Sequence, residues 1–190
     1  MKHFEVHVTI QNAEGEEQRL VEFCKGRDNI KPVLIDLDGT GHDLMTSSRK
    51  TCEDGDYKTF ANTITRLLVF NNFKILRLKV ESDLEDTPEE AEFYYEAHVR
   101  VDGSSYDDPK LVALCKEHKA HKSRNLFKEA DTKTQMITIR DGNKTSFNKR
   151  VDAIIEALEK SYFRVGEKVE REYCVFDSNV NHDIEWIQKS

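Results

Sequence analysis

The sequence lacks the features that mark membrane-spanning and secreted proteins. Its 190 residues contain three prolines, one tryptophan and four cysteines, with no Cys-x-x-Cys pair. No stretch approaches the roughly 20 apolar residues that span a bilayer. From Met1 onward the chain alternates polar and apolar residues, without the apolar run of a signal peptide. We therefore expect a cytoplasmic protein with reduced thiols and no membrane association.

Basic residues are also fewer than acidic residues. The chain has 29 Lys and Arg against 36 Asp and Glu, which gives a formal net charge of −7. A general nucleic-acid binder uses a surplus of Lys and Arg to displace counterions from phosphates, so this balance argues against such a function. Charged residues make up 34% of the chain and hydrophobic residues 37%. Because the hydrophobic residues recur periodically, we expect a folded chain and not a disordered one.

What the sequence does contain is an internal duplication. The clearest matches pair residues 5–10 with 96–101, 20–25 with 111–116, 45–49 with 136–140, and 54–68 with 141–155. Self-similarity of this kind is the signature of a duplicated supersecondary unit. The duplication also places two Glu-x-His pairs in one molecule, which is the best lead to a function.

Each copy carries the same order of expected elements. Alternation at period two predicts strands, and apolar residues at helical spacing predict helices. The first copy should contain strand 4–10, helix 17–27, strands 32–38 and 43–50, a helix after Asp56 and strand 73–81. The second copy should contain strand 93–101, a helix from Asp108-Pro109, strands near 123–129 and 134–140, a helix after Asn143 and a strand near 165–176.

This β-α-β-β-α-β order is typical of the ferredoxin-like unit, an antiparallel sheet with both helices on one face. We therefore predict an α+β fold of two tandem ferredoxin-like repeats, residues 1–82 and 93–176, related by a pseudo-twofold axis. An acidic linker, residues 83–92, should join the repeats. The tail 177–190 should dock on the body, with Trp186 as its anchor.

Ionisable residues lie on the side of the sheet that the helices should leave uncovered. Successive side chains of a strand alternate, so the polar residues of each copy's first strand share that side. They are Glu5, His7 and Thr9 in the first copy, and Glu96, His98 and Arg100 in the second. Neighbouring strands add the basic residues Arg49, Arg77, Lys79 and Arg140. Three further histidines are expected at the surface or in loops: His42, His118 and His121.

The sequence leaves several interpretations of these faces open. They are salt-bridged or solvated, since burying such groups without partners is costly. They bind a charged or phosphorylated small molecule, a protein partner or a second copy of the chain. Alternatively, the Glu-x-His pairs supply ligands for a divalent metal, or Glu5, Lys79 and Glu81 belong to a tunnel that grips a triphosphate through a metal. We expect a binding or assembly module, and we assign it no resident cofactor or metal.

The tetrapeptide His7-Val8-Thr9-Ile10 resembles the His-hydrophobic-Thr-hydrophobic motif of the two-histidine (2H) phosphoesterases. That family also has two similar lobes, each contributing one motif to a central cleft, and acts on cyclic nucleotides or RNA ends. The resemblance implies that His7 and His98 are a catalytic acid–base pair and that Thr9 is a phosphate-binding hydroxyl. It covers two tetrapeptides and the duplicated plan. The second tetrapeptide departs from the motif, with Arg100 where the family has Ser or Thr.

Overall fold

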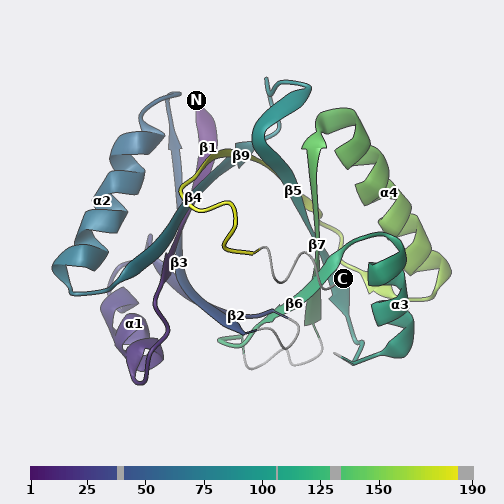
Figure 1. The fold of residues 1–190 in the computed structure, drawn as a ribbon, viewed down its shortest axis with the longest axis horizontal. Coiled ribbons are helices and arrows are strands. Elements are labelled where there is room, and N and C mark those ends of the chain that lie inside the picture. Colours follow the sequence, from purple (N-terminus) through teal and green to yellow (C-terminus); the bar gives the residue numbers. More distant parts are fainter. Residues whose placement is uncertain (38–40, 106, 129–133, 184–190) are drawn as a thin grey trace.

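The computed structural model describes residues 1–37, 41–105, 107–128 and 134–183 (Figure 1). The first half contains β1 (Lys2–Ile10), α1 (Glu16–Cys24), β2 (Lys31–Asp36), β3 (His42–Cys52), α2 (Tyr57–Phe70) and β4 (Ile75–Asp83). The second half contains β5 (Glu90–Asp102), α3 (Pro109–Glu117), β6 (His121–Asn125), β7 (Thr134–Asn143), α4 (Lys144–Lys160), β8 (Arg164–Val165) and β9 (Glu170–Asp177). Strands and helices thus follow the same order in both halves, with one additional short strand in the second.

The strands form one continuous antiparallel sheet that closes on itself. Their order is β7-β6-β2-β3-β1-β4-β9-β5, and β5 pairs with β7 to complete a ring of eight strands. The short strand β8 pairs with the end of β5 and is not part of this ring. Figure 1 looks through the ring, with α1 and α2 on one side of it and α3 and α4 on the other. The helices therefore cover the outside of a barrel.

The predicted fold class, two tandem ferredoxin-like repeats with separate sheets, is therefore wrong. Each half contributes four strands to the ring, but the halves join edge to edge at two seams, β2 against β6 and β4 against β9. A free strand edge carries unpaired N–H and C=O groups, and joining the edges of the two halves satisfies these groups. The two faces that we expected to be open consequently line the interior of one barrel.

Apolar side chains fill the space between the ring and the helices. On β1, Phe4, Val6, Val8 and Ile10 are buried in a core that includes the inner face of α2. The second half has a matching core around β5 and α4: Tyr95, Ala97, Val99, Val101, Phe147, Val151, Ile154 and Leu158. Because side chains alternate along a strand, the polar residues between these apolar ones point into the barrel. The predicted alternation of β1 and β5 is confirmed.

Several local features accompany this arrangement. Asp108 accepts hydrogen bonds from the backbone N–H groups of Lys110 and Leu111, and Asn143 accepts one from Ser146, so both act as helix N-caps. The four cysteines are buried free thiols. Within the described residues, none of the helices combines the length and the apolar character that crossing a membrane requires.

The C-terminal segment differs from its prediction. The strand expected at 165–176 is split into β8 and β9. After β9, residues 178–183 turn back across the ring, shown at the yellow end of the chain in Figure 1. Nε2 of His182 lies 3.0 Å from Oδ1 of Asp43, near the start of β3, so this segment covers the end of the barrel at which β3 begins. Trp186, the predicted anchor, lies outside the described residues.

Candidate functional site

Charged side chains from both halves meet inside the barrel. Glu81 and Glu96 are among the most buried residues of the protein, with 0% and 1% of their surface exposed. Burying an ionised carboxylate is costly unless opposite charges and hydrogen bonds compensate it. The predicted site residues that contribute to this interior network are Glu5, His7, Arg49, Arg77, Lys79, Glu96, His98 and Arg140.

Five ionisable groups form a line that joins the two halves. Oε2 of Glu81 lies 3.2 Å from Nε2 of His7 and 3.0 Å from Nζ of Lys79. Nζ of Lys79 donates a hydrogen bond to Oε1 of Glu96 at 2.7 Å, and the same oxygen lies 3.2 Å from Nε2 of His98. Two carboxylates and one ammonium group therefore stand between the imidazoles in this line.

Burial and pairing together determine the charges in this line. Burial disfavours the imidazolium form of His98, but the hydrogen bond and the charge of Glu96 outweigh it and raise the pKa of His98 to about 9. Burial also opposes ionisation of Glu96, yet the charges of Arg140 and Lys79 hold the pKa of Glu96 well below its ordinary value. His98 is therefore a cation at neutral pH and acts as a hydrogen-bond donor.

Two arginines form a second cluster at the end of the barrel that the C-terminal segment covers. Arg77 donates to Asp177 through Nε at 2.9 Å and to Asp183 through Nη1 at 2.8 Å. Nη2 of Arg140 lies 2.6 Å from Oδ2 of Asp183, and its guanidinium lies over the ring of Tyr94, 4.5 Å from the centroid. Carboxylates of the chain itself thus neutralise both of these predicted ligand-binding residues.

Thr9 and Arg100 are the remaining predicted site residues of the tetrapeptides that begin at His7 and His98, and their surroundings differ from each other. Thr9 is 2% exposed, and its Cα lies opposite that of Arg77 in the β1–β4 pair. Arg100 is exposed and donates a hydrogen bond to Asp102 at 2.7 Å. Catalysis through His7 and His98 stays a prediction from the sequence.

His121 is a residue that the sequence analysis placed wrongly. We expected it at the surface or in a loop, but it lies in β6 with 6% of its surface exposed. Burial, followed by the positive charges of Arg140 and Arg150, lowers the pKa of His121 to about 4. Because β6 contains no apolar residue, an alternation of polar and apolar residues could not indicate which of its side chains are buried. His42, by contrast, is exposed as expected.

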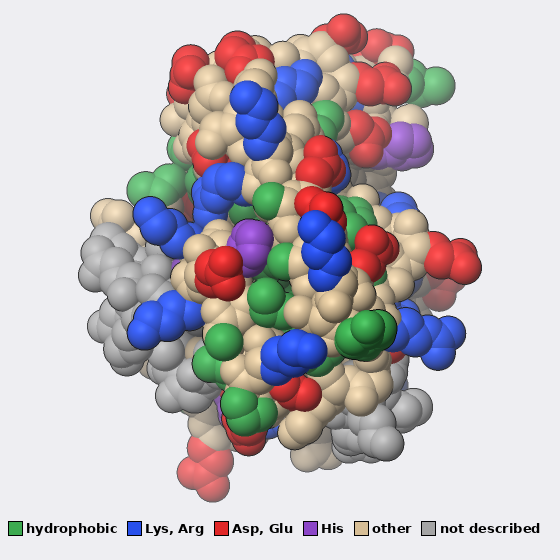
Figure 2. Space-filling view, turned by 90° about the vertical axis from the view of Figure 1, so that its right-hand side faces the viewer, with side chains coloured by type: hydrophobic (Ala, Val, Ile, Leu, Met, Phe, Trp, Pro, Cys, Tyr) green, Lys and Arg blue, Asp and Glu red, His purple; other side chains and the backbone are tan. Residues whose placement is uncertain are grey.

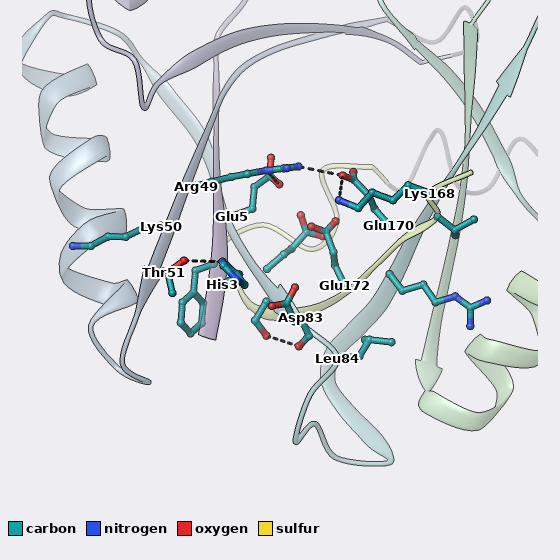
Figure 3. Close-up of a pocket in the computed structure, with 15 residues that line it drawn as sticks. His3, Glu5, Arg49, Lys50, Thr51, Asp83, Leu84, Lys168, Glu170 and Glu172 are labelled. Atoms are coloured by element: carbon teal, nitrogen blue, oxygen red, sulfur yellow. Dashed lines mark hydrogen bonds and ion pairs between the residues drawn. The ribbon is translucent and has the colours of Figure 1, made fainter. Parts of the chain in front are cut away.

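At the end of the barrel opposite the C-terminal segment, the ring opens into a cavity of about 650 Å³, which we call the mouth cavity (Figure 3). The start of β1, the ends of β3 and β4, and the start of β9 form its wall. The polar residues that line it include His3, Glu5, Arg49, Thr51, Glu81, Asp83, Lys168, Glu170 and Glu172. Figure 3 shows charged groups from β1, β3 and β9 converging on one space, to which both halves contribute.

The ion pair of Arg49 with Glu170 bridges the two halves across the mouth cavity. Glu5 accepts hydrogen bonds from Oγ of Ser47 and from Nε of Arg49, both at 2.6 Å. Nη2 of Arg49 donates to Glu170 at 3.4 Å, and Nζ of Lys168 donates to the same carboxylate at 3.3 Å. These contacts run between side chains that are partly exposed, so a charged ligand can exchange with them.

Glu172 is a site residue that the sequence analysis missed. Its carboxylate lies 4.0 Å from Nε2 of His98. Burial, followed by the negative charge of Glu81, raises the pKa of Glu172 to about 8. The period-two spacing of Lys168, Glu170 and Glu172 is the signal that could have identified it.

The outside of the barrel offers a contrast. On the face over α3 and α4, side chains of both charge signs are mixed with scattered apolar ones (Figure 2). Among the described residues in this view, no broad area carries a single sign. Charged groups on this face therefore do not converge as they do in the mouth cavity and the barrel interior.

A comparison with protein family models finds no match, and neither does a comparison with curated proteins. Among solved structures, the chain is similar to the acetolactate synthase small subunit from Thermotoga maritima, at 15% identity and a TM-score of 0.33 over 92% of this chain and 96% of that one. It is also similar to chlorite dismutase from Candidatus Nitrospira defluvii in complex with imidazole, at 15% identity and a TM-score of 0.33 over 98% and 94%. Likenesses at this TM-score support no functional conclusion.

Proposed function

We propose that the protein is a binding module that takes a charged small molecule in the mouth cavity. The observation that carries this proposal is a space of about 650 Å³ lined by charged side chains from both halves of the barrel. Ligand pockets in proteins commonly measure about 300–1,000 Å³, and a few placed polar groups give them specificity. The size of the cavity therefore suits a small molecule.

Closure of the barrel favours a small ligand over a protein partner. The polar faces predicted to bind a partner line an interior, and their central residues are buried. A stable interface with a folded protein needs roughly 800 Å² of surface from each partner. A small molecule entering at the mouth cavity can reach Glu5, Arg49 and Glu172 without opening the ring.

Narrowing the mouth cavity tests the proposal. Thr51 is exposed and lines the cavity, so Thr51→Trp should fill part of it without disturbing the core. A thermal-shift screen of charged small molecules on the unchanged protein should find saturable stabilisation, because a ligand that binds only the folded state stabilises it. Thr51→Trp should weaken binding of the selected compound about tenfold or more.

Asn62→Trp is the matched control, since Asn62 is exposed on α2 and does not line the mouth cavity. It should bind the compound as the unchanged protein does. The proposal is wrong if no charged compound gives saturable stabilisation, or if both tryptophan variants bind it equally well.

A further inference from the structure

Building on the proposed binding function, we infer that the mouth cavity takes a small organic cation that carries two or more amino or guanidino groups. Three observations support this ligand class: the balance of charge around the cavity, a buried carboxylate oxygen without a hydrogen-bond partner, and the spacing of the acidic groups.

Carboxylates outnumber the cations that face the mouth cavity. Five acidic residues line it: Glu5, Glu81, Asp83, Glu170 and Glu172. Of the basic lining residues, Lys50 points toward α2 and lies over the ring of Phe60, and Arg171 binds Asp152 on α4. Of the other basic lining residues, His3 is hydrogen-bonded to Thr51, and Arg49 and Lys168 face the cavity. The surplus of negative charge attracts a cation and repels an anion.

Glu81 points to a ligand in a second way. It lines the mouth cavity and is 0% exposed. Lys79 and His7 lie 3.0 and 3.2 Å from its Oε2, whereas its Oε1 has no hydrogen-bond partner among the described residues. A buried acceptor with unmet hydrogen-bonding capacity costs free energy, which a donor from a ligand would recover.

Negative charge also dominates around Glu172, although the imidazole of His98 lies 4.0 Å from its carboxylate. Burial, followed by repulsion from Glu81, raises the pKa of Glu172 to about 8 against the opposing charges of His98 and Lys79. At neutral pH part of the population therefore holds a proton on this carboxyl group. A bound ammonium group would favour the carboxylate form and release that proton. Binding of the ligand should consequently be linked to proton release.

The spacing of the acidic groups favours an extended organic cation over a metal ion. Among the described residues, Asp43, His182 and Asp183 bring three possible metal-ligand atoms within 4.8 Å of one another. These three residues do not line the mouth cavity. Metal ions such as Ca²⁺ and Mg²⁺ need oxygen ligands at about 2.0–2.6 Å around one point. Carboxylates spread around a larger space match separate cationic groups joined by a carbon chain.

Calorimetric titration of the full chain with spermidine at neutral pH and low salt tests the inference. We expect saturable binding, and a dependence of the measured heat on the ionisation enthalpy of the buffer that reports proton release. Glu172→Gln should weaken binding about tenfold or more, since one charge pair is lost, and should abolish the proton release. Its melting temperature should not fall, because glutamine resembles the protonated form of Glu172.

Glu156→Gln on the outer face of α4 is the matched control, and Glu170→Gln at the rim of the cavity is a second test variant. Equal affinity of the Glu172→Gln and Glu156→Gln variants for spermidine overturns the inference. Saturable binding of sodium tripolyphosphate that Thr51→Trp blocks, without binding of spermidine, also overturns it but leaves the proposed function standing. If spermidine, tripolyphosphate and the screened compounds all fail to bind, both the inference and the proposed function are wrong.

Discussion

Glu172 and His98 lie 4.0 Å apart on neighbouring strands, and the fold raises the pKa of both. For Glu172, burial and the charge of Glu81 disfavour the carboxylate and bring the pKa to about 8. For His98, burial disfavours the charged form, but pairing with Glu96 outweighs it and brings the pKa to about 9. Each group therefore binds its proton more tightly in the folded chain than in the unfolded one. Stability linked to these groups must fall as the pH rises.

We expect the melting temperature to fall as the pH is raised from about 6 to about 9. The contribution of Glu172 is complete below its ordinary pKa of 4.5 and is lost as the pH passes about 8. That of His98 is complete below 6.5 and is lost as the pH passes about 9. Circular dichroism melts across this range should show a smaller fall for Glu172→Gln than for the unchanged chain. A melting temperature that rises over the range contradicts this assignment.

At the scale of elements, the alternation of polar and apolar residues predicted side-chain direction well for strands that pack one side on a helix. It placed Glu5, His7 and Glu96 inside the barrel correctly, because the apolar residues between them face α2 and α4. The same alternation failed for β6, which has no apolar residue. It also could not predict the register shift in the pairing of β9 with β4, which lies between Val80 and Glu81. A register shift depends on backbone pairing that no side-chain period records.

The C-terminal segment is the other element whose role could not be read from its sequence. Asp183 is 4% exposed and reaches two arginines from different halves, Arg77 and Arg140. Neither arginine is near Asp183 along the chain, so no local pattern predicts these pairs. The segment thereby connects the halves at the end of the barrel opposite the mouth cavity.

Asp183→Asn should lower the free energy of unfolding by about 1–3 kcal/mol, the range for losing hydrogen bonds to charged groups. The loss should stay in this range because Arg77 keeps Asp177 and Arg140 keeps Glu96. Urea denaturation at neutral pH measures the change. Asp28→Asn at an exposed position is the control and should be nearly neutral. Equal stabilities of the two variants would show that Asp183 does not connect the halves.

At the scale of the whole molecule, the duplication is visible in the sequence but the closure of the barrel is not. Edge strands pair through backbone groups that nearly all residues share, so the sequence gives no indication that β2 would meet β6. That seam has two paired positions, Ile35 with Asn125 and Asp36 with Arg124. Closure turns two polar faces into one interior, and the mouth cavity exists only because both halves contribute to its wall. The candidate site therefore depends on the joining of the halves.

A cross-link through the β2–β6 seam tests this dependence most directly. The Cα atoms of Ile35 and Asn125 lie opposite each other, and opposed antiparallel residues are about 4.5–5.5 Å apart, within the range that a disulfide spans. After mild oxidation, the double variant Ile35→Cys/Asn125→Cys should form an intramolecular disulfide, detected by mass spectrometry and by faster migration on a non-reducing gel. The single variants Ile35→Cys and Asn125→Cys should not. If both introduced thiols stay reduced, or cross-link only between molecules, the two halves do not close into one barrel.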